Sequence, residues 1–262
     1  MNTNNHRNNN FDTNNYLFNP NSKHGIYLIH GFSSTTYEVK KLAEHLAQNG
    51  YYVQADNLPG HATSIEDCNL ITHNEWLTFV EQKIATMYTK CDKVIVMGIS
   101  MGAVLALHLG SIFPLDGVVA AGALFKFKNE FDVRVLVRLF HRFKTKVPKF
   151  KNFNSKELKL INHQFYGYNH YPLVALNEMR KMVDKVKDKL YQISSPVLLI
   201  HSKIDQTAVF ENYNIIKSLL KTSDLSSLVL EKTGHHIFDT EESDKQEIFS
   251  KISTFTQNIL NE

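Results

Sequence analysis

The stretch Val94-Ile95-Val96-Met97-Gly98-Ile99-Ser100-Met101-Gly102-Ala103-Val104-Leu105 decides the fold of this chain. Its first four apolar residues predict a buried strand, and the apolar residues after Gly102 predict a helix. The turn between them fits the pattern G-x-S-x-G, in which a serine is exposed on a sharp bend at the top of a parallel sheet. We therefore interpret Ser100 as a nucleophile rather than as a residue that only caps a helix.

The alternation of strand and helix continues on both sides of this turn. Short apolar runs predict buried strands at 26–30, 51–55, 94–98, 118–122, 197–201 and 227–231, with an edge strand at 16–18. Helical periodicity occurs between most of them, at 39–46, 76–87, 104–109 and 215–220, and again at 248–260. This order predicts an α/β fold with a mostly parallel central sheet flanked by helices.

One long stretch, 124–190, breaks the alternation. It has no clear buried strand but shows helical patterns over 133–140 and 173–186, and it is too long for a simple connection. We predict a helical cap inserted at 124–190 into an α/β core formed by 15–123 and 191–262. Residues 1–14 are rich in Asn and poor in apolar residues, which predicts a disordered tail.

The predicted cap is strongly basic. It carries 16 Lys and Arg against 6 Asp and Glu, a net of +10, and the whole chain carries only +3, which leaves −7 for the rest. Such charge usually marks a solvated face, but it could also favour transient contact with an anionic membrane surface. The many aromatic residues of the cap fit either the core of a small lid or an apolar tunnel for an acyl chain. A nucleic-acid partner is disfavoured because no recognition motif accompanies the charge.

A second glycine-rich turn follows the predicted strand at 26–29. His30-Gly31-Phe32 lies where the chain turns over the end of the sheet, so the N–H of Phe32 is placed to bind a developing oxyanion. The N–H of Met101, at the start of the helix after Ser100, is the second candidate donor. We expect His30 to be a structural residue that bonds to loop backbone.

A serine hydroxyl needs a base, and this fold places the acid and then the histidine after the serine. Asp205 follows the strand at 197–201, and His235 follows the strand at 227–231. We prefer His235 to His236 because it comes directly after a glycine, and Asp205 to Asp239 because Asp239 lies beyond the histidine. Asp205 would hold the imidazole in the tautomer that accepts the serine proton.

Composition limits the remaining possibilities. The chain has 262 residues, of which 43% are hydrophobic, enough for one large domain. Two cysteines, no secretory signal and no apolar run of membrane-spanning length predict a cytoplasmic protein. His201, His235, His236 and Asp205 match no standard ligand spacing, so we expect neither a metal nor an organic cofactor.

Together these motifs resemble the small carboxylesterases and monoacylglycerol lipases of the α/β-hydrolase fold. The matching segments are His30-Gly31-Phe32, Leu58-Pro59-Gly60-His61, Gly98 to Gly102, Asp205 and Gly234-His235, with Glu66-Asp67 and Trp76 in addition. The resemblance extends from about Tyr16 to Leu260 and is weakest in the cap. It departs from the family at Ala62, where members usually have glycine after Gly-His.

The resemblance implies a carboxylic ester hydrolase with Ser100, Asp205 and His235 as triad and the N–H groups of Phe32 and Met101 as oxyanion hole. The substrate would be a small ester or a monoacylglycerol. Two alternatives stay open at this point. One is a thioesterase or lactonase that uses the same triad, and the other is a ligand-binding protein of this fold without catalysis.

Overall fold

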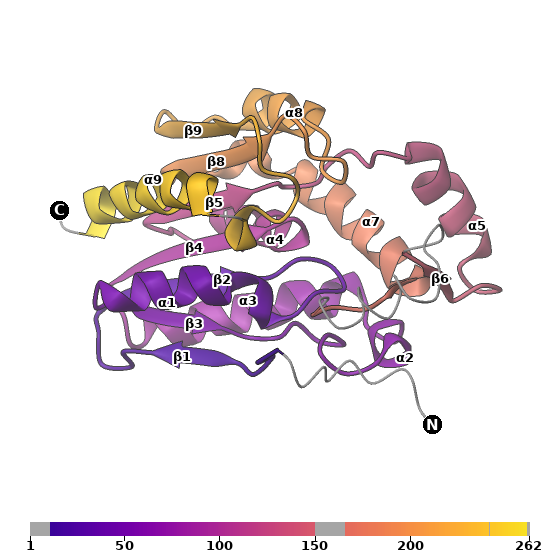
Figure 1. Ribbon diagram of the computed structural model, residues 1–262, viewed down its shortest axis with the longest axis horizontal. Coiled ribbons are helices and arrows are strands. Elements are labelled where there is room, and N and C mark those ends of the chain that lie inside the picture. Colours follow the sequence, from indigo (N-terminus) through magenta and orange to yellow (C-terminus); the bar gives the residue numbers. More distant parts are fainter. Residues whose placement is uncertain (1–10, 150–165, 241, 261–262) are drawn as a thin grey trace.

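The computed structural model describes residues 11–149, 166–240 and 242–260 (Figure 1). Its central sheet has seven strands in the order β1-β3-β2-β4-β5-β8-β9. Their bounds are β1 Tyr16–Phe18, β2 His24–Ile29, β3 Tyr52–Ala55, β4 Lys93–Ile99, β5 Gly117–Ala121, β8 Val197–Ser202 and β9 Leu225–Leu230. Only β1 is antiparallel to its neighbour in this sheet, so the predicted mostly parallel sheet is confirmed.

Alternate residues of the strands face opposite sides of the sheet, which gives the protein two hydrophobic cores. In β4, Val94 and Val96 belong to one core, and Ile95 and Met97 belong to the other. All four are fully buried. This is why the strands read as continuous apolar runs rather than as alternating ones.

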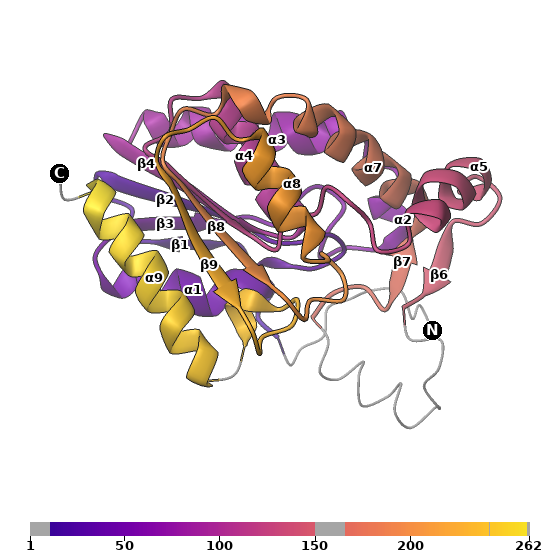
Figure 2. The same cartoon turned by 90° about the horizontal axis from the view of Figure 1, so that it is seen from above.

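Helices cover both faces of the sheet (Figures 1 and 2). On one face lie α1 (Lys40–Gln48) and α9 (Glu242–Leu260), whose apolar residues complete one core. On the other face lie α3 (His73–Tyr88), α4 (Met101–Ile112), α7 (Leu173–Lys187) and α8 (Glu211–Leu219). A capping box starts α3, where Thr72 and Glu75 bond to each other's backbone N–H. The helices therefore cover both faces of the parallel sheet, and loops follow the carboxyl ends of its strands, where sites form in open α/β sheets.

Between β5 and β8 lies the stretch predicted as a cap, 124–190, which we call the insertion. It contains a π-helix (Asp132–Val137), α5 (Arg138–Phe140), β6 (Lys146–Pro148), β7 (His170–Pro172) and α7. The predicted helices at 133–140 and 173–186 are present, whereas the short β6–β7 pair was not predicted. α5 projects at the end of the molecule opposite α9 (Figure 2). In contrast, α7 packs into the core beside α3 and α4 through Met182 and Val186.

The remaining elements are short: η1 (Thr36–Val39), α2 (Ile65–Cys68), η3 (Leu190–Gln192) and η4 (Ile237–Asp239). Residues 11–14, expected to belong to a disordered tail, are hydrogen-bonded to the core. Asp12 pairs with Lys40 at 3.1 Å, and Thr36 donates to the carbonyl of Asn14 at 2.7 Å. The first ten residues of the predicted tail lie outside the described residues. No described helix combines the length and apolar character needed to span a bilayer.

Candidate active site

Ser100 stands on the bend between β4 and α4. Its backbone has a φ of +56° and a ψ of −117°, which are strained for any residue other than glycine. Such a conformation persists only where the surrounding structure enforces it. A Cβ on Gly98 would lie 2.0 Å from the carbonyl oxygen of Gly102, so only glycine fits. The predicted turn from strand to helix is therefore present, and the serine side chain is fixed at the start of a buried helix.

The glycine after Ser100 brings this bend against the loop that follows β2. A Cβ on Gly102 would lie 2.1 Å from the carbonyl oxygen of Ile29, and one on Gly31 would lie 3.2 Å from Cβ of Ser100. The backbone N–H of Phe32 has no backbone acceptor among the described residues, and Met101 is the first residue of α4, where an N–H has no partner within the helix. Two unbonded donors beside the serine, one on a loop and one at the start of a helix, are the arrangement that an oxyanion hole requires.

Two buried histidines, His30 and His61, hold the loop after β2. His30 donates from Nδ1 to the carbonyl of Gly31 at 2.8 Å and accepts the N–H of Leu58 at Nε2. His61 donates from Nδ1 to the carbonyl of Pro59 and accepts the N–H of Ser33 at 3.0 Å. Burial lowers the pKa of His30 to about 4 and that of His61 to about 3. Both rings are therefore neutral and engaged with backbone, as a structural role requires.

The carboxyl ends of β8 and β9 bring Asp205 and His235 together. His235 donates from Nδ1 to Oδ2 of Asp205 at 2.7 Å, and this carboxylate is fully buried. Its other oxygen accepts the N–H groups of Thr207 and Ala208 at 2.7 and 2.9 Å. Burial alone would raise the pKa of Asp205, but the bond and charge of His235 and these N–H groups outweigh it and lower the pKa. The carboxylate is thus held ionised behind the imidazole.

Ser100 approaches this pair through the end of β5. Its N–H donates to the carbonyl of Ala121 at 2.9 Å. A Cβ on the next residue, Gly122, would lie 3.7 Å from both Oδ2 of Asp205 and Cε1 of His235. No hydrogen bond joins Oγ of Ser100 to His235 within the described part of the chain. Such bonds are often long in enzymes without substrate and shorten when substrate binds.

The two rivals of these residues point elsewhere. The side chain of His236 is 56% exposed, and its Nδ1 lies 3.9 Å from Oε1 of Glu38. Asp239 forms an ion pair with Lys41. It is the last residue of η4, and α9 begins only at Glu242. Within the described residues, only Asp205 of the two candidate acids bonds to the imidazole of His235.

Several polar residues that the sequence analysis did not single out hold these loops. Ser202 donates to the carbonyl of Thr233, which ties the end of β8 to the loop of His235. Fully buried Asn212 accepts the N–H groups of Phe125 and Lys126, where the insertion begins. Single asparagines and serines leave no periodic signal, so no pattern in one sequence could have identified them.

The insertion also bonds directly to the loop after β2. Lys149 donates from Nζ to Oγ of Ser33 at 2.6 Å, and the N–H of Tyr168 donates to the carbonyl of Ser33 at 2.8 Å. Thr35 donates to the carbonyl of Tyr166 at 3.1 Å. Burial lowers the pKa of Lys149 to about 7. The insertion therefore lies over the loop that carries Phe32, where a lid would cover a bound substrate.

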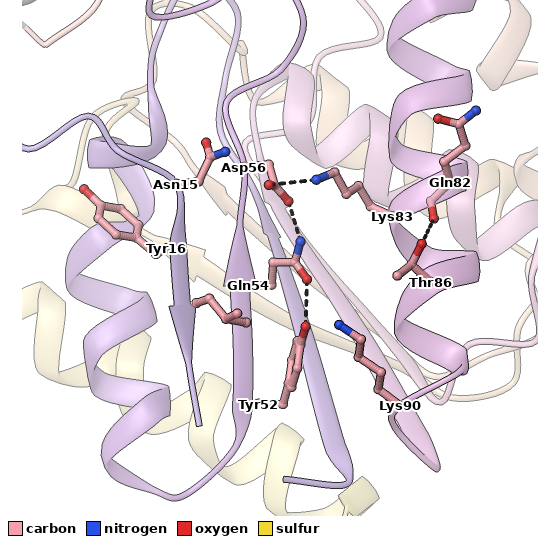
Figure 3. Close-up of a pocket in the computed structure, with 10 residues that line it drawn as sticks. Asn15, Tyr16, Tyr52, Gln54, Asp56, Gln82, Lys83, Thr86 and Lys90 are labelled. Carbon is pink, nitrogen blue, oxygen red and sulfur yellow. Dashed lines mark hydrogen bonds and ion pairs between the residues drawn. The ribbon is translucent and has the colours of Figure 1, made fainter. Parts of the chain in front are cut away.

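A hollow of about 460 Å³ lies away from these residues, between β1, β3 and α3. Figure 3 shows a line of hydrogen bonds in it, from Tyr52 through Gln54 to Asp56 and Lys83. Neither Ser100, Asp205 nor His235 lines this hollow. Because its polar groups bond to one another, we interpret this line as a link between β3 and α3. Within the described residues, no group of three or more His, Cys, Asp or Glu side chains is arranged to hold a metal ion.

Comparisons with known proteins show the family to which this chain belongs. The profile of the family described as serine aminopeptidase, S33, matches residues 20–243. A thermostable monoacylglycerol lipase of Bacillus sp. (strain H-257) is 26% identical over 212 residues, which are 80% of this chain and 82% of that protein. A carboxylesterase of Bacillus subtilis (strain 168) is 24% identical over 220 residues, 84% of this chain and 87% of that protein.

Solved structures show the same fold. The monoacylglycerol lipase of Paleococcus ferrophilus superposes with a TM-score of 0.78 at 18% identity, covering 94% of this chain and 99% of that chain. A structure from work on LipS and LipT, two metagenome-derived lipolytic enzymes, gives a TM-score of 0.81 at 20% identity, with coverage of 94% and 98%. The α/β-hydrolase fold expected from the motifs is therefore confirmed.

Proposed function

Because this chain belongs to the serine aminopeptidase S33 family of hydrolases, we propose that it cleaves carboxylic esters through an acyl-enzyme on Ser100. The observation that carries the proposal is the 2.7 Å bond between His235 and Asp205 beside the strained Ser100. Two relatives of this chain are a monoacylglycerol lipase and a carboxylesterase, which supports esters as the substrate class.

The chemistry follows from the tautomer of His235. Its Nδ1–H is engaged by Asp205, so Nε2 carries the lone pair that takes the proton from Ser100. Oγ of Ser100 then attacks the ester carbonyl, and the N–H groups of Phe32 and Met101 stabilise the negative oxygen that forms. His235 returns the proton to the leaving alcohol. Water, deprotonated by the same ring, hydrolyses the acyl-enzyme and regenerates the serine.

The proposal is tested with a panel of substrates. The purified protein is assayed with acyl-p-nitrophenyl esters and monoacylglycerols of increasing chain length, with Ser100→Ala as control. Acyl-CoAs, lactones and an aminoacyl anilide are the competing classes. Fastest turnover of the esters, abolished by Ser100→Ala, supports the proposal. Preference for thioesters or lactones would favour the alternative enzymes, and no turnover of any class would favour a binding protein.

The exposed face of the insertion supports a membrane partner as well. Phe131, Leu139, Phe140 and Phe143 are exposed, the last at 89%. Arg138, Arg142 and Lys144 are exposed among them. Apolar side chains interleaved with basic ones suit the headgroup region of an anionic bilayer, where each cation contributes about 1 kcal/mol. We propose that this face, residues 131–144, binds anionic lipid surfaces on which ester substrates are carried.

Vesicle sedimentation tests this partner. The wild type should bind vesicles that contain phosphatidylglycerol more tightly than purely zwitterionic ones, and Phe140→Ser with Phe143→Ser should lose the binding. Leu17→Ser is the matched control, because Leu17 is an exposed apolar residue, at 53%, on β1. All variants should hydrolyse a water-soluble ester equally. Equal binding to both kinds of vesicle would exclude this role.

The two cysteines support a reducing, cytoplasmic location as part of the proposal. Cys68 and Cys91 are both buried and unpaired. Burial raises the pKa of Cys68 to about 12, which keeps it an inert thiol. Localisation of the tagged full-length protein by fractionation would test this; recovery outside the cytoplasmic fraction would contradict it.

A further inference from the structure

A buried carboxylate without a role in the proposed chemistry lies next to the loop after β2, which carries Phe32 and which we call the oxyanion loop (residues 30–34). Glu38, in η1, is only 4% exposed. A carboxylate is costly to bury unless hydrogen bonds compensate for the lost water. The contacts of Glu38 therefore indicate what this charge is retained for.

One oxygen of Glu38 holds the backbone of the oxyanion loop. Its Oε2 accepts the N–H of Gly31 at 2.7 Å, across seven residues of chain. A Cβ on Gly31 would lie 3.1 Å from this oxygen and 3.2 Å from Cβ of Ser100. The backbone of Gly31 is thus enclosed between the carboxylate and the bend that carries the nucleophile.

Side chains hold both peptide units that meet at Gly31. The carbonyl of Gly31 accepts Nδ1–H of His30 at 2.8 Å, and its N–H is held by Glu38, so both polar groups of Gly31 are bonded. Glu38 holds the peptide unit before Gly31, and His30 holds the one after it, which carries the N–H of Phe32. A bond to a charged acceptor is about twice as strong as a neutral one, which suits a group that must not move.

The second oxygen of Glu38 faces the loop after β9, which carries His235. Its Oε1 lies 3.9 Å from Nδ1 of His236, the neighbour of His235. The same nitrogen lies 3.4 Å from the hydroxyl of Tyr166, and the charge of Glu38 partly offsets the lowering of the Lys149 pKa by burial. Glu38 thus lies between the loop of Phe32, to which it is hydrogen-bonded, and the loop that carries His235, from which its second oxygen is 3.9 Å away.

We propose that Glu38 is a positioning residue. It orients the Phe32 N–H toward the oxyanion and holds the loop of Phe32 in register with the loop that carries His235. The inference rests on the proposed esterase function. It predicts an effect on the transition state that exceeds the effect on substrate binding, because Glu38 touches neither the substrate nor Ser100 directly.

Steady-state kinetics on a water-soluble ester test the inference. Glu38→Ala should lower kcat by about 10- to 100-fold, as expected when a reacting group is misplaced. KM should stay within about twofold. Affinity for an alkyl boronic acid, which resembles the tetrahedral intermediate, should fall in parallel with kcat. Glu38→Gln keeps the volume and an acceptor for the Gly31 N–H but loses the charge, so it should recover only part of the loss and serves as the test if the alanine variant unfolds.

Glu75→Ala is the matched control. Glu75 also accepts a backbone N–H, from Thr72 at 2.8 Å, but in the capping box of α3. It should lose thermal stability and keep kcat. Unchanged kcat and boronate affinity in Glu38→Ala and Glu38→Gln, with the wild type active and Ser100→Ala inactive, would overturn the inference alone. A wild type without esterase activity would overturn both the inference and the proposed function.

Discussion

The imidazole of His235 donates a 2.7 Å hydrogen bond to a carboxylate oxygen of Asp205 that is completely buried. The bond determines which nitrogen of the ring faces the site. Since Nδ1 carries the proton, Nε2 is the acceptor, as a general base for Ser100 requires. The two N–H groups on the other carboxylate oxygen prevent Asp205 from rotating away.

Asp205→Asn should therefore lower kcat by about 10³- to 10⁴-fold while the protein stays folded, because an amide stabilises the wrong tautomer. Asp239→Asn is the control: it removes the other acid near the end of β9, which pairs with Lys41 instead of the imidazole. It should retain wild-type kcat on a p-nitrophenyl ester. Equal losses in the two variants would contradict the assignment of Asp205.

Gly102 allows the serine bend to approach β2. Gly102→Ala would place a Cβ 2.1 Å from the carbonyl of Ile29, so backbone must move. We expect destabilisation of about 3 kcal/mol or more and loss of activity. Gly234→Ala should be tolerated in both respects, because a Cβ there meets nothing within 4 Å and no positive φ is required. Urea unfolding of both variants checks this; similar midpoints would contradict the close packing at Gly102.

Ala62 occupies the position after Gly-His where relatives were expected to have glycine. Its φ is +57°, a left-handed conformation that costs a side chain about 1 kcal/mol. Ala62→Gly should therefore be neutral or stabilising. Ala47→Gly, in the last turn of α1, should destabilise by up to about 1 kcal/mol. Thermal unfolding would contradict this account if the Ala62 variant lost as much stability as the Ala47 variant.

Acid should unfold the protein through its buried histidines. Burial lowers the pKa of His30 to about 4 and of His61 to about 3, from 6.5. Below a pH of about 6.5 these imidazoles are protonated in the unfolded chain but stay neutral in the folded protein. Stability is therefore full above pH of about 6.5 and falls as pH drops toward 4, by about 1.4 kcal/mol per pH unit for each ring.

Urea unfolding across this range measures the slope. His61→Gln should reduce it, because one of the buried neutral rings is gone, while His30 and His201, whose pKa burial also lowers to about 4, still contribute. Glutamine can still accept the Ser33 N–H that His61 holds, so the variant should fold. A slope that His61→Gln leaves unchanged, or a free energy of unfolding that does not vary with pH, would contradict the neutral burial of these rings.

Most of the fold could be predicted from the sequence because the buried strands are continuous apolar runs between helical patterns. The strand ends differ from the predicted ones by one or two residues, as at β2 and β9. Strand ends depend on hydrogen bonds to neighbouring strands, which a single sequence does not show. The β6–β7 pair was missed because its strands are only three residues long and partly exposed. Strands of that length carry too few residues for an alternation to be recognised.

Only those residues of the candidate site that lie in or next to a sequence motif could be predicted. Ser100 lies in a five-residue pattern, and Asp205 and His235 follow apolar strands, so their positions in the chain suggest the roles proposed for them. Glu38 lies in no motif: its contact with Gly31 depends on how η1 folds back over the loop. Side chains that act by orienting backbone in this way leave no mark on a single sequence.

The central claim is that Ser100 is the residue that forms the acyl-enzyme. Reaction of the full-length protein with a fluorophosphonate, followed by mass spectrometry of its peptides, tests this most directly. We predict a single adduct on Ser100, absent from Ser100→Ala and strongly slowed in His235→Ala. An adduct on another residue, or an unreactive wild type that is correctly folded, would contradict it.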